Sequence, residues 1–149
     1  MVLSAAVLRA TGADFTSLGP DARVEGLDNE QALSGSFYSR LGHLTLMARI
    51  NARTKQIPTA PFGTVPGAEG TEVEDVRGFA EVRYERPLSE RVSLSLRGAS
   101  DMSRYRGYWM YEAEDGEGLE RDTDAGRADW LSAEARVDCF VAGSPVASC

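Results

Sequence analysis

The sequence predicts an all-β protein, an antiparallel up-and-down meander of five to six strands. Apolar and polar residues alternate with a period of two along several segments, which is the pattern of strands with one apolar face. Turn-like sequences separate two pairs of these segments, and long polar sequences separate the others. No segment has the periodicity of an amphipathic helix. These observations favour a meander at residues 33–140, preceded by a weak strand and a polar loop (1–32) and followed by an unpatterned tail (141–149).

The first well-patterned pair of strands lies on either side of Gly42-His43. Leu41 would face Leu44, and Ser39 would face Leu46, so that the apolar residues of both arms share one face. Glycine at the first position of a two-residue loop suits a type II′ turn. The sequence therefore predicts a β-hairpin here, with a weak strand before it at residues 3–11. Residues 54–74 are rich in proline and glycine and are expected to form a long loop.

A second hairpin is predicted around Pro87-Leu88-Ser89. A turn at this point would set Tyr84 opposite Val92 and Glu85 opposite Arg91. The second arm is expected to continue for about 20 residues, well beyond the usual strand of a soluble protein. Residues 111–129 are acidic and are expected to form a solvated loop. Calcium binding through their carboxylates is the alternative, although their spacing does not match an EF-hand calcium loop. A final strand is predicted at about 130–140.

Composition excludes several function classes. The net charge is −7 with a pI near 4.8, so we expect no nucleic-acid partner. His43 is the one histidine, which leaves no base for a catalytic triad and no histidine-based metal site. We therefore predict that the chain is not an enzyme and binds no cofactor or metal. Cys139 and Cys149 are interpreted as incidental thiols, with a disulfide or a metal pair as the alternatives.

Alternation alone fits either a membrane β-barrel or a soluble antiparallel sheet that acts as a binding or interaction module. The membrane interpretation is favoured by an apolar face built mainly of Ala, Val and Leu, by the long strand, and by aromatic residues near strand ends. The expected interface aromatics are Tyr84, Tyr108, Trp109 and Trp130, although strict alternation turns both tryptophans inward. Charged residues that would face a lumen, where cross-strand ion pairs are expected, are Arg49, Arg53, Glu81, Arg83, Arg97, Glu134 and Arg136.

Several blocks of sequence resemble the barrel of TonB-dependent outer-membrane receptors. They are LTLMARINAR and RTKQIPTAPFGT, which meet at Arg53, then DVRGFAEVRYERPLSERVSLSLR, the run Asp-x-x-x-Tyr-Arg-Gly at 101–107, and ADWLSAEARVD in the final strand. The resemblance implies a bacterial outer-membrane location and energy-coupled uptake of a scarce ligand by the complete receptor. It also implies outer-membrane lipid, the TonB system, a plug and further strands as partners. Because such receptors have about 22 strands, we expect this chain to supply a segment of one barrel.

Overall fold

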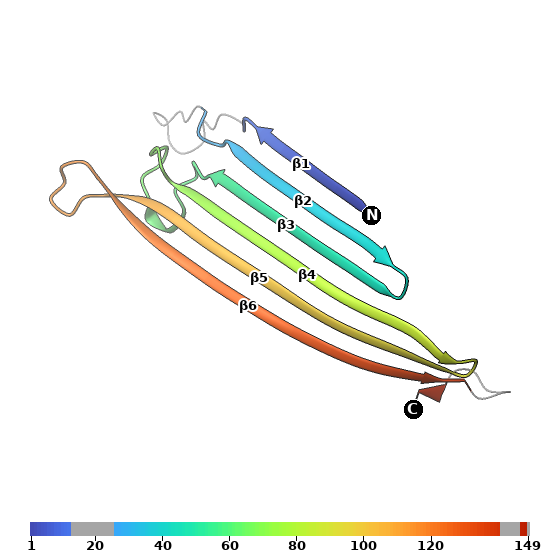
Figure 1. The fold of residues 1–149 in the computed structure, drawn as a ribbon. Coiled ribbons are helices and arrows are strands. Elements are labelled where there is room, and N and C mark those ends of the chain that lie inside the picture. Colours follow the sequence, from blue (N-terminus) through green and yellow to red (C-terminus); the bar gives the residue numbers. More distant parts are fainter. Residues whose placement is uncertain (13–25, 141–146, 149) are drawn as a thin grey trace.

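A computed structural model describes residues 1–12, 26–140 and 147–148. The chain forms one antiparallel sheet in which every strand pairs with its neighbour in sequence. The strands are β1 (Val2–Ala10), β2 (Glu30–Leu41), β3 (Leu44–Gln56), β4 (Glu72–Ser89), β5 (Val92–Glu112), β6 (Leu119–Cys139) and β7 (Ala147–Ser148). The sheet is open, and one short 3-10 helix, η1 (Pro61–Gly63), lies between β3 and β4 (Figure 1). The predicted all-β meander is confirmed.

The N-terminal strand is present, and its neighbour β2 begins earlier than the sequence pattern predicts. β1 pairs with β2 along its whole length, from Val2 opposite Tyr38 to Ala10 opposite Glu30. Residues 30–32 therefore belong to β2 rather than to the predicted polar loop. Most of that loop, residues 13–25, lies outside the described residues.

The hairpin of β2 and β3 has the predicted register. Leu41 is opposite Leu44, and Ser39 is opposite Leu46. Gly42 has a φ of 60°, a left-handed value that glycine adopts without strain, whereas His43 does not have a positive φ. This combination is that of the predicted type II′ turn.

The hairpin of β4 and β5 turns later than predicted, at Glu90-Arg91. Tyr84 faces Leu96 rather than Val92, and Glu85 faces Ser95 rather than Arg91. Pro87 is inside β4 and not in the turn, because it lies beyond the last pair of β3 and β4, where β4 has a neighbour on one side only. The shift is four residues in β5, an even number, so the side chains that pair with β4 up to Pro87 keep their predicted faces. Between Pro87 and Ser89 the register shifts.

β6 begins at Leu119, so most of the acidic segment predicted as a loop is strand. Only residues 113–118 connect β5 to β6, while β5 has the predicted great length of 21 residues. Alternation failed as a signal because residues 119–129 carry charged side chains on both faces. These residues become strand by pairing with the upper part of β5, where the Arg121 guanidinium lies 4.4 Å from the centre of the Tyr108 ring.

The C-terminal tail also differs from the prediction. β7 pairs with Asp138 and Cys139 at the end of β6. Cys139 is disulfide-bonded, which corrects its interpretation as an incidental thiol, while Cys149 lies outside the described residues. The sequence pattern missed this because a two-residue strand is too short to show alternation, and because the chain must return along β6 before a cysteine of the tail can meet Cys139.

The sheet has two unlike ends, and the described residues form no second layer over it. Both two-residue turns lie at one end, while residues 57–71 and 113–118 connect strands at the other end (Figure 1). Among the described residues, only Ala99 and Trp109 are buried apolar residues. No helix in this described part is long and apolar enough to cross a membrane. The sheet therefore leaves its apolar face uncovered, and most of its strands depend on hydrogen bonding to their neighbours.

Candidate functional site

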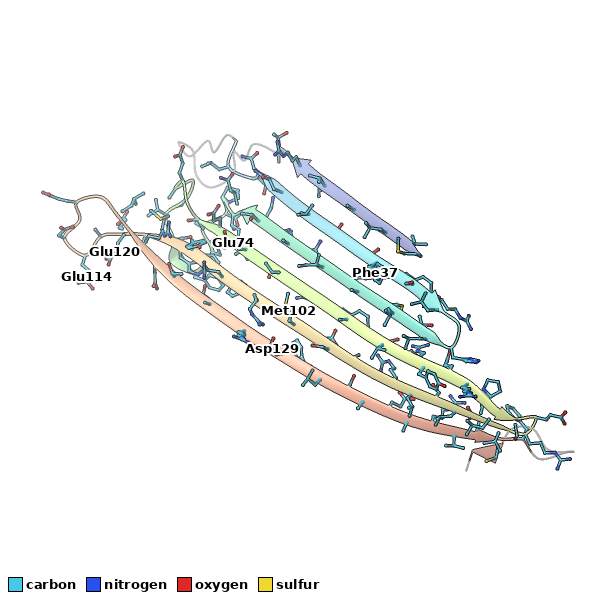
Figure 2. The ribbon with its side chains drawn as sticks, in the orientation of Figure 1. Phe37, Glu74, Met102, Glu114, Glu120 and Asp129 are labelled. Carbon is cyan, nitrogen blue, oxygen red and sulfur yellow. The ribbon has the colours of Figure 1, made fainter. Side chains whose placement is uncertain are left out.

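One face of the sheet carries a band without charged side chains, here called the apolar band. Its members are every second residue, starting with the first, of the ranges that follow. The ranges are 33–41 on β2, 44–54 on β3, 76–84 on β4, 92–102 on β5 and 131–139 on β6, and the strand register places them on one face. On β4 the band ends at Tyr84, because Arg86, the next residue on that face, lies opposite Leu94. Phe37 and Met102 both belong to this band (Figure 2). Apart from the buried Ser39, the members of the band are exposed or half-buried, and Leu131 is 86% exposed. A face of this composition has no partner inside the described chain.

The apolar band has a defined height. On β5 it runs from Val92 to Met102, which is about 33 Å along a strand and about 25 Å of vertical thickness for a strand tilted by about 40°. Beyond Met102, toward the end with long connections, the same face becomes charged. Arg104 and Arg127 both pair with Asp129, at 2.8 and 2.7 Å. The hydrogen bonds from Arg127 and Arg104 lower the pKa of Asp129.

The opposite face, here called the polar face, holds all seven residues that the sequence analysis assigned to a lumen. Three of them converge. Glu81, whose side chain is 3% exposed, accepts hydrogen bonds from Arg97 Nε at 2.6 Å and from an Arg83 terminal nitrogen at 2.9 Å. Glu134 is directly opposite Arg97, and its negative charge also attracts the Arg97 guanidinium. This cluster satisfies a buried carboxylate with two guanidinium groups.

The remaining predicted polar-face residues lie apart from that cluster. Arg53 pairs with Glu30 through two hydrogen bonds of 2.8 and 3.1 Å, and Arg136 pairs with Asp138 at 2.8 Å. Arg49 is exposed and makes no hydrogen bond or ion pair with the described residues. The ion pair expected between Glu85 and Arg91 is not formed, because the later turn separates the two residues.

The four aromatic residues divide between the two faces. Tyr84 lies on the apolar face near the short turns, where its ring contacts His43 with centroids 6.2 Å apart. Tyr108 lies on the same face at the other end. Trp109 and Trp130 lie on the polar face, as alternation predicts, and Trp130 is 55% exposed. Only the two tyrosines are therefore in a position to meet an interface beside the apolar band.

Sequence reasoning missed a small packed cluster at the end with long connections. Trp109 is 6% exposed, its Nε1 donates to Asp124 Oδ1 at 2.9 Å, and its ring meets the Phe62 ring edge-on at 5.1 Å. Residues 57–71 are thereby held over β5, and the Val65 N–H also donates to the Met110 carbonyl at 2.8 Å. The available signal was a single aromatic, Phe62, within a proline- and glycine-rich segment.

Gly107 forms the floor of this cluster. A methyl group on Gly107 would lie 2.2 Å from Asp124 Oδ1 and 2.7 Å from Trp109 Nε1, so no side chain fits there. Tyr105 lies beside the same carboxylate, and burial, followed by the negative charge of Asp124, raises the pKa of the Tyr105 hydroxyl. The cluster fixes a long connection onto the sheet and contains no metal-binding group of three acidic, histidine or cysteine residues among the described residues.

No protein-family model, no curated protein and no solved structure matches this chain. The resemblance to TonB-dependent receptors therefore rests on the sequence blocks alone. What the geometry offers is a sheet with a charge-free apolar band on one face, an ion-paired polar face on the other, and a packed cluster at one end.

Proposed function

We propose that this chain forms part of the wall of an outer-membrane β-barrel, and that the complete barrel takes up a scarce ligand as a TonB-dependent receptor does. In this arrangement the apolar band faces lipid and the polar face lines the lumen. The end with two-residue turns faces the periplasm, and the end with residues 57–71 and 113–118 faces outward, which is the usual asymmetry of such barrels.

The observation that carries the proposal is the apolar band itself. Five neighbouring strands place uncharged residues on one face over about 26–33 Å along each strand, or about 20–25 Å of height for strands tilted by about 40°, which is close to the lipid-facing belt of a membrane barrel. The same face becomes charged beyond that height, at Arg104, Arg127 and Asp129. A soluble sheet that buried this face in a core would need a second layer, and the described residues supply none.

The strand edges indicate which partners such a wall needs. β1 pairs only with β2, and β6 pairs with β7 only at Asp138 and Cys139. The backbone groups along the outer edges of β1 and most of β6 therefore have no strand of the described residues beside them. In lipid each unpaired backbone group costs several kcal/mol, so further strands must pair with both edges to close the barrel.

The direct test is reconstitution. The purified chain, diluted from urea into buffer, into detergent micelles or into lipid vesicles, is followed by circular dichroism and by size-exclusion chromatography. We expect aggregation in buffer, and a β-sheet signal with a defined size only in micelles or vesicles. In micelles or vesicles, acyl chains would cover the exposed apolar residues of the band and remove their surface from water.

The alternative function is a soluble interaction module, whose apolar face is buried against a partner or a second copy. The same exposed apolar band supports this alternative. In the module the band would be covered by a protein surface, whereas in the barrel it would be covered by lipid. A monodisperse β-sheet species in buffer without detergent would contradict the membrane proposal and support the module.

A further inference from the structure

A hollow of about 580 Å³ lies on the polar face, midway along the strands. Its residues follow two adjacent rows that cross the sheet. One row runs through Ser4, Ser36, Arg49, Phe79, Asp101 and Trp130. The Ser4 and Ser36 hydroxyls are hydrogen-bonded to each other at 2.7 Å, which shows that the row shares one face. The short side chains of β1 and β2 leave the space that the hollow occupies.

Two arginines in this hollow have no counter-ion. Arg49 is opposite Ser36 and Phe79, while Arg77 is opposite Asn51 and Ser103. Both arginines are exposed, and neither makes an ion pair or hydrogen bond with the described residues. Six other arginines are ion-paired with described residues, namely Arg53, Arg83, Arg97, Arg104, Arg127 and Arg136. Among the described arginines without an ion pair, Arg49 and Arg77 are the two that line the hollow.

Neighbouring carboxylates do not neutralise this pair. Asp75 precedes Arg77 by two residues on the same face, but it is directly opposite Arg53 on β3. Asp101 is opposite Phe79 and Trp130 and attracts Arg97 in the neighbouring cluster. Because Arg49 and Arg77 are diagonal neighbours on adjacent strands, their Cβ atoms are about 7–8 Å apart, close enough for both guanidinium groups to reach one anion.

Aromatic rings lie in the same row as Arg49. Phe79 is directly opposite it on β4, and Trp130 is at the far end of the row on β6 with 55% of its surface exposed. A flat ring can stack on such aromatic faces, while guanidinium groups bind carboxylates and phosphates through paired hydrogen bonds. The hollow thus combines two unpaired cations and one carboxylate, Asp101, with two ring surfaces. The two cations and the rings are the groups that recognise a ring bearing an oxyanion.

We propose that this hollow binds a small ring compound carrying a carboxylate or phosphate group, with Arg49 and Arg77 holding the oxyanion and Phe79 or Trp130 contacting the ring. The proposal deepens the proposed function, since the polar face would line the lumen, and it rests on that function only for its location. Binding requires the sheet to be folded and does not require the apolar band to face lipid.

The test uses the full chain refolded in micelles and isothermal titration calorimetry. The probes are glucose 6-phosphate, for an anionic sugar, and phthalate, for an anionic aromatic ring, with uncharged glucose as the control ligand. The protein variants are Arg49→Gln and Arg77→Gln. Their matched control is Arg40→Gln, another exposed arginine on the polar face that lies outside the hollow.

We expect at least one anionic probe to bind with a dissociation constant of about 1 mM or below. Glucose should bind at least about tenfold more weakly. Arg49→Gln and Arg77→Gln should each weaken the anionic probe about tenfold, and Arg40→Gln should leave it unchanged. The proposal is overturned by no binding of either anionic probe, by equal binding of glucose, or by an equal loss in Arg40→Gln. Vesicle reconstitution, measured separately, shows whether the membrane proposal fails as well.

Discussion

The two halves of this sheet use the same strands in different ways. In the half with short turns, β5 alternates between the apolar band and charged residues of the polar face, such as Arg97. In the half with long connections, both faces carry charges, and Arg104 and Asp129 pair on the face that is apolar lower down. In the proposed membrane arrangement, the first pattern faces lipid on one side, and the second faces water on both sides. The composition of one face therefore changes along β5 and β6 while the strands remain paired.

The largest expected effect breaks the apolar band. Ala135→Arg places a charge at mid-height on β6, and we expect it to destabilise the vesicle-inserted state by about 2–4 kcal/mol. The measurement is urea unfolding in lipid vesicles. Ser132→Arg is the matched control, because Ser132 lies on the same strand and on the polar face. Equal destabilisation by both variants would show that the two faces do not differ in environment.

The ion-paired cluster of the polar face is the next target. Glu81→Gln leaves Arg83 and Arg97 without their carboxylate, and we expect a loss of about 1–3 kcal/mol in the free energy of unfolding, since Glu81 is buried. Urea unfolding in micelles measures the change. Glu85→Gln, an exposed neighbour on the same face, should change stability by less than about 0.5 kcal/mol. A neutral Glu81→Gln would mean that the cluster does not stabilise the sheet.

In the half with long connections, Gly107→Ala tests the packed cluster. The added methyl group displaces Asp124 or Trp109, so the segment 57–71 should detach from β5 and be cleaved faster by protease. Amide exchange at Val65, whose N–H is held by the Met110 carbonyl, should also accelerate. Gly126→Ala is the control, because its added methyl group meets only ordinary contacts at 3.8 Å or more. Unchanged cleavage in Gly107→Ala would contradict the cluster's role.

The smallest effect concerns the Tyr105 hydroxyl. Its pKa is raised by burial and by Asp124, so its phenol should ionise above the ordinary tyrosine range in an ultraviolet titration. Because the folded pKa is the higher one, this group's contribution to stability is complete below a pH of about 10 and is lost as the pH rises through the folded pKa. Asp124→Asn should move the titration back toward the ordinary range. A Tyr105 that titrates like a free tyrosine would contradict the packed geometry.

The alternation of apolar and polar residues predicted most strands of the fold. The strands and turns that it did not predict have physical causes. The Gly42 turn was predictable because its positive φ demands glycine, whereas Pro87 resembled a turn and lies in a strand where one neighbour is missing. Residues 130–139 of β6 were predictable from the sequence because one face of this part of the strand is apolar. Residues 119–129 of β6 were not predictable, because they form a strand through pairing with β5 and show no alternating pattern of their own.

The candidate site was predictable to the level of faces and not of contacts. Alternation assigned Glu81, Arg83 and Arg97 to one face, but their convergence depends on the register of β4 and β5, which the sequence misplaced by four residues. The absence of a counter-ion for Arg49 and the contact of Phe62 with Trp109 depend on which strands and loops become neighbours in space. No local pattern reports those neighbours.

The most direct test of the membrane account is a tryptophan scan along β6 in vesicles that contain brominated lipid. In a background with Trp109→Phe and Trp130→Phe, single tryptophans at positions 131 to 136 report contact with acyl chains through quenching of their fluorescence. The account predicts strong quenching at 131, 133 and 135 and weak quenching at 132, 134 and 136, because alternate residues face lipid and lumen. Equal quenching at both sets of positions, or none at either, would contradict it.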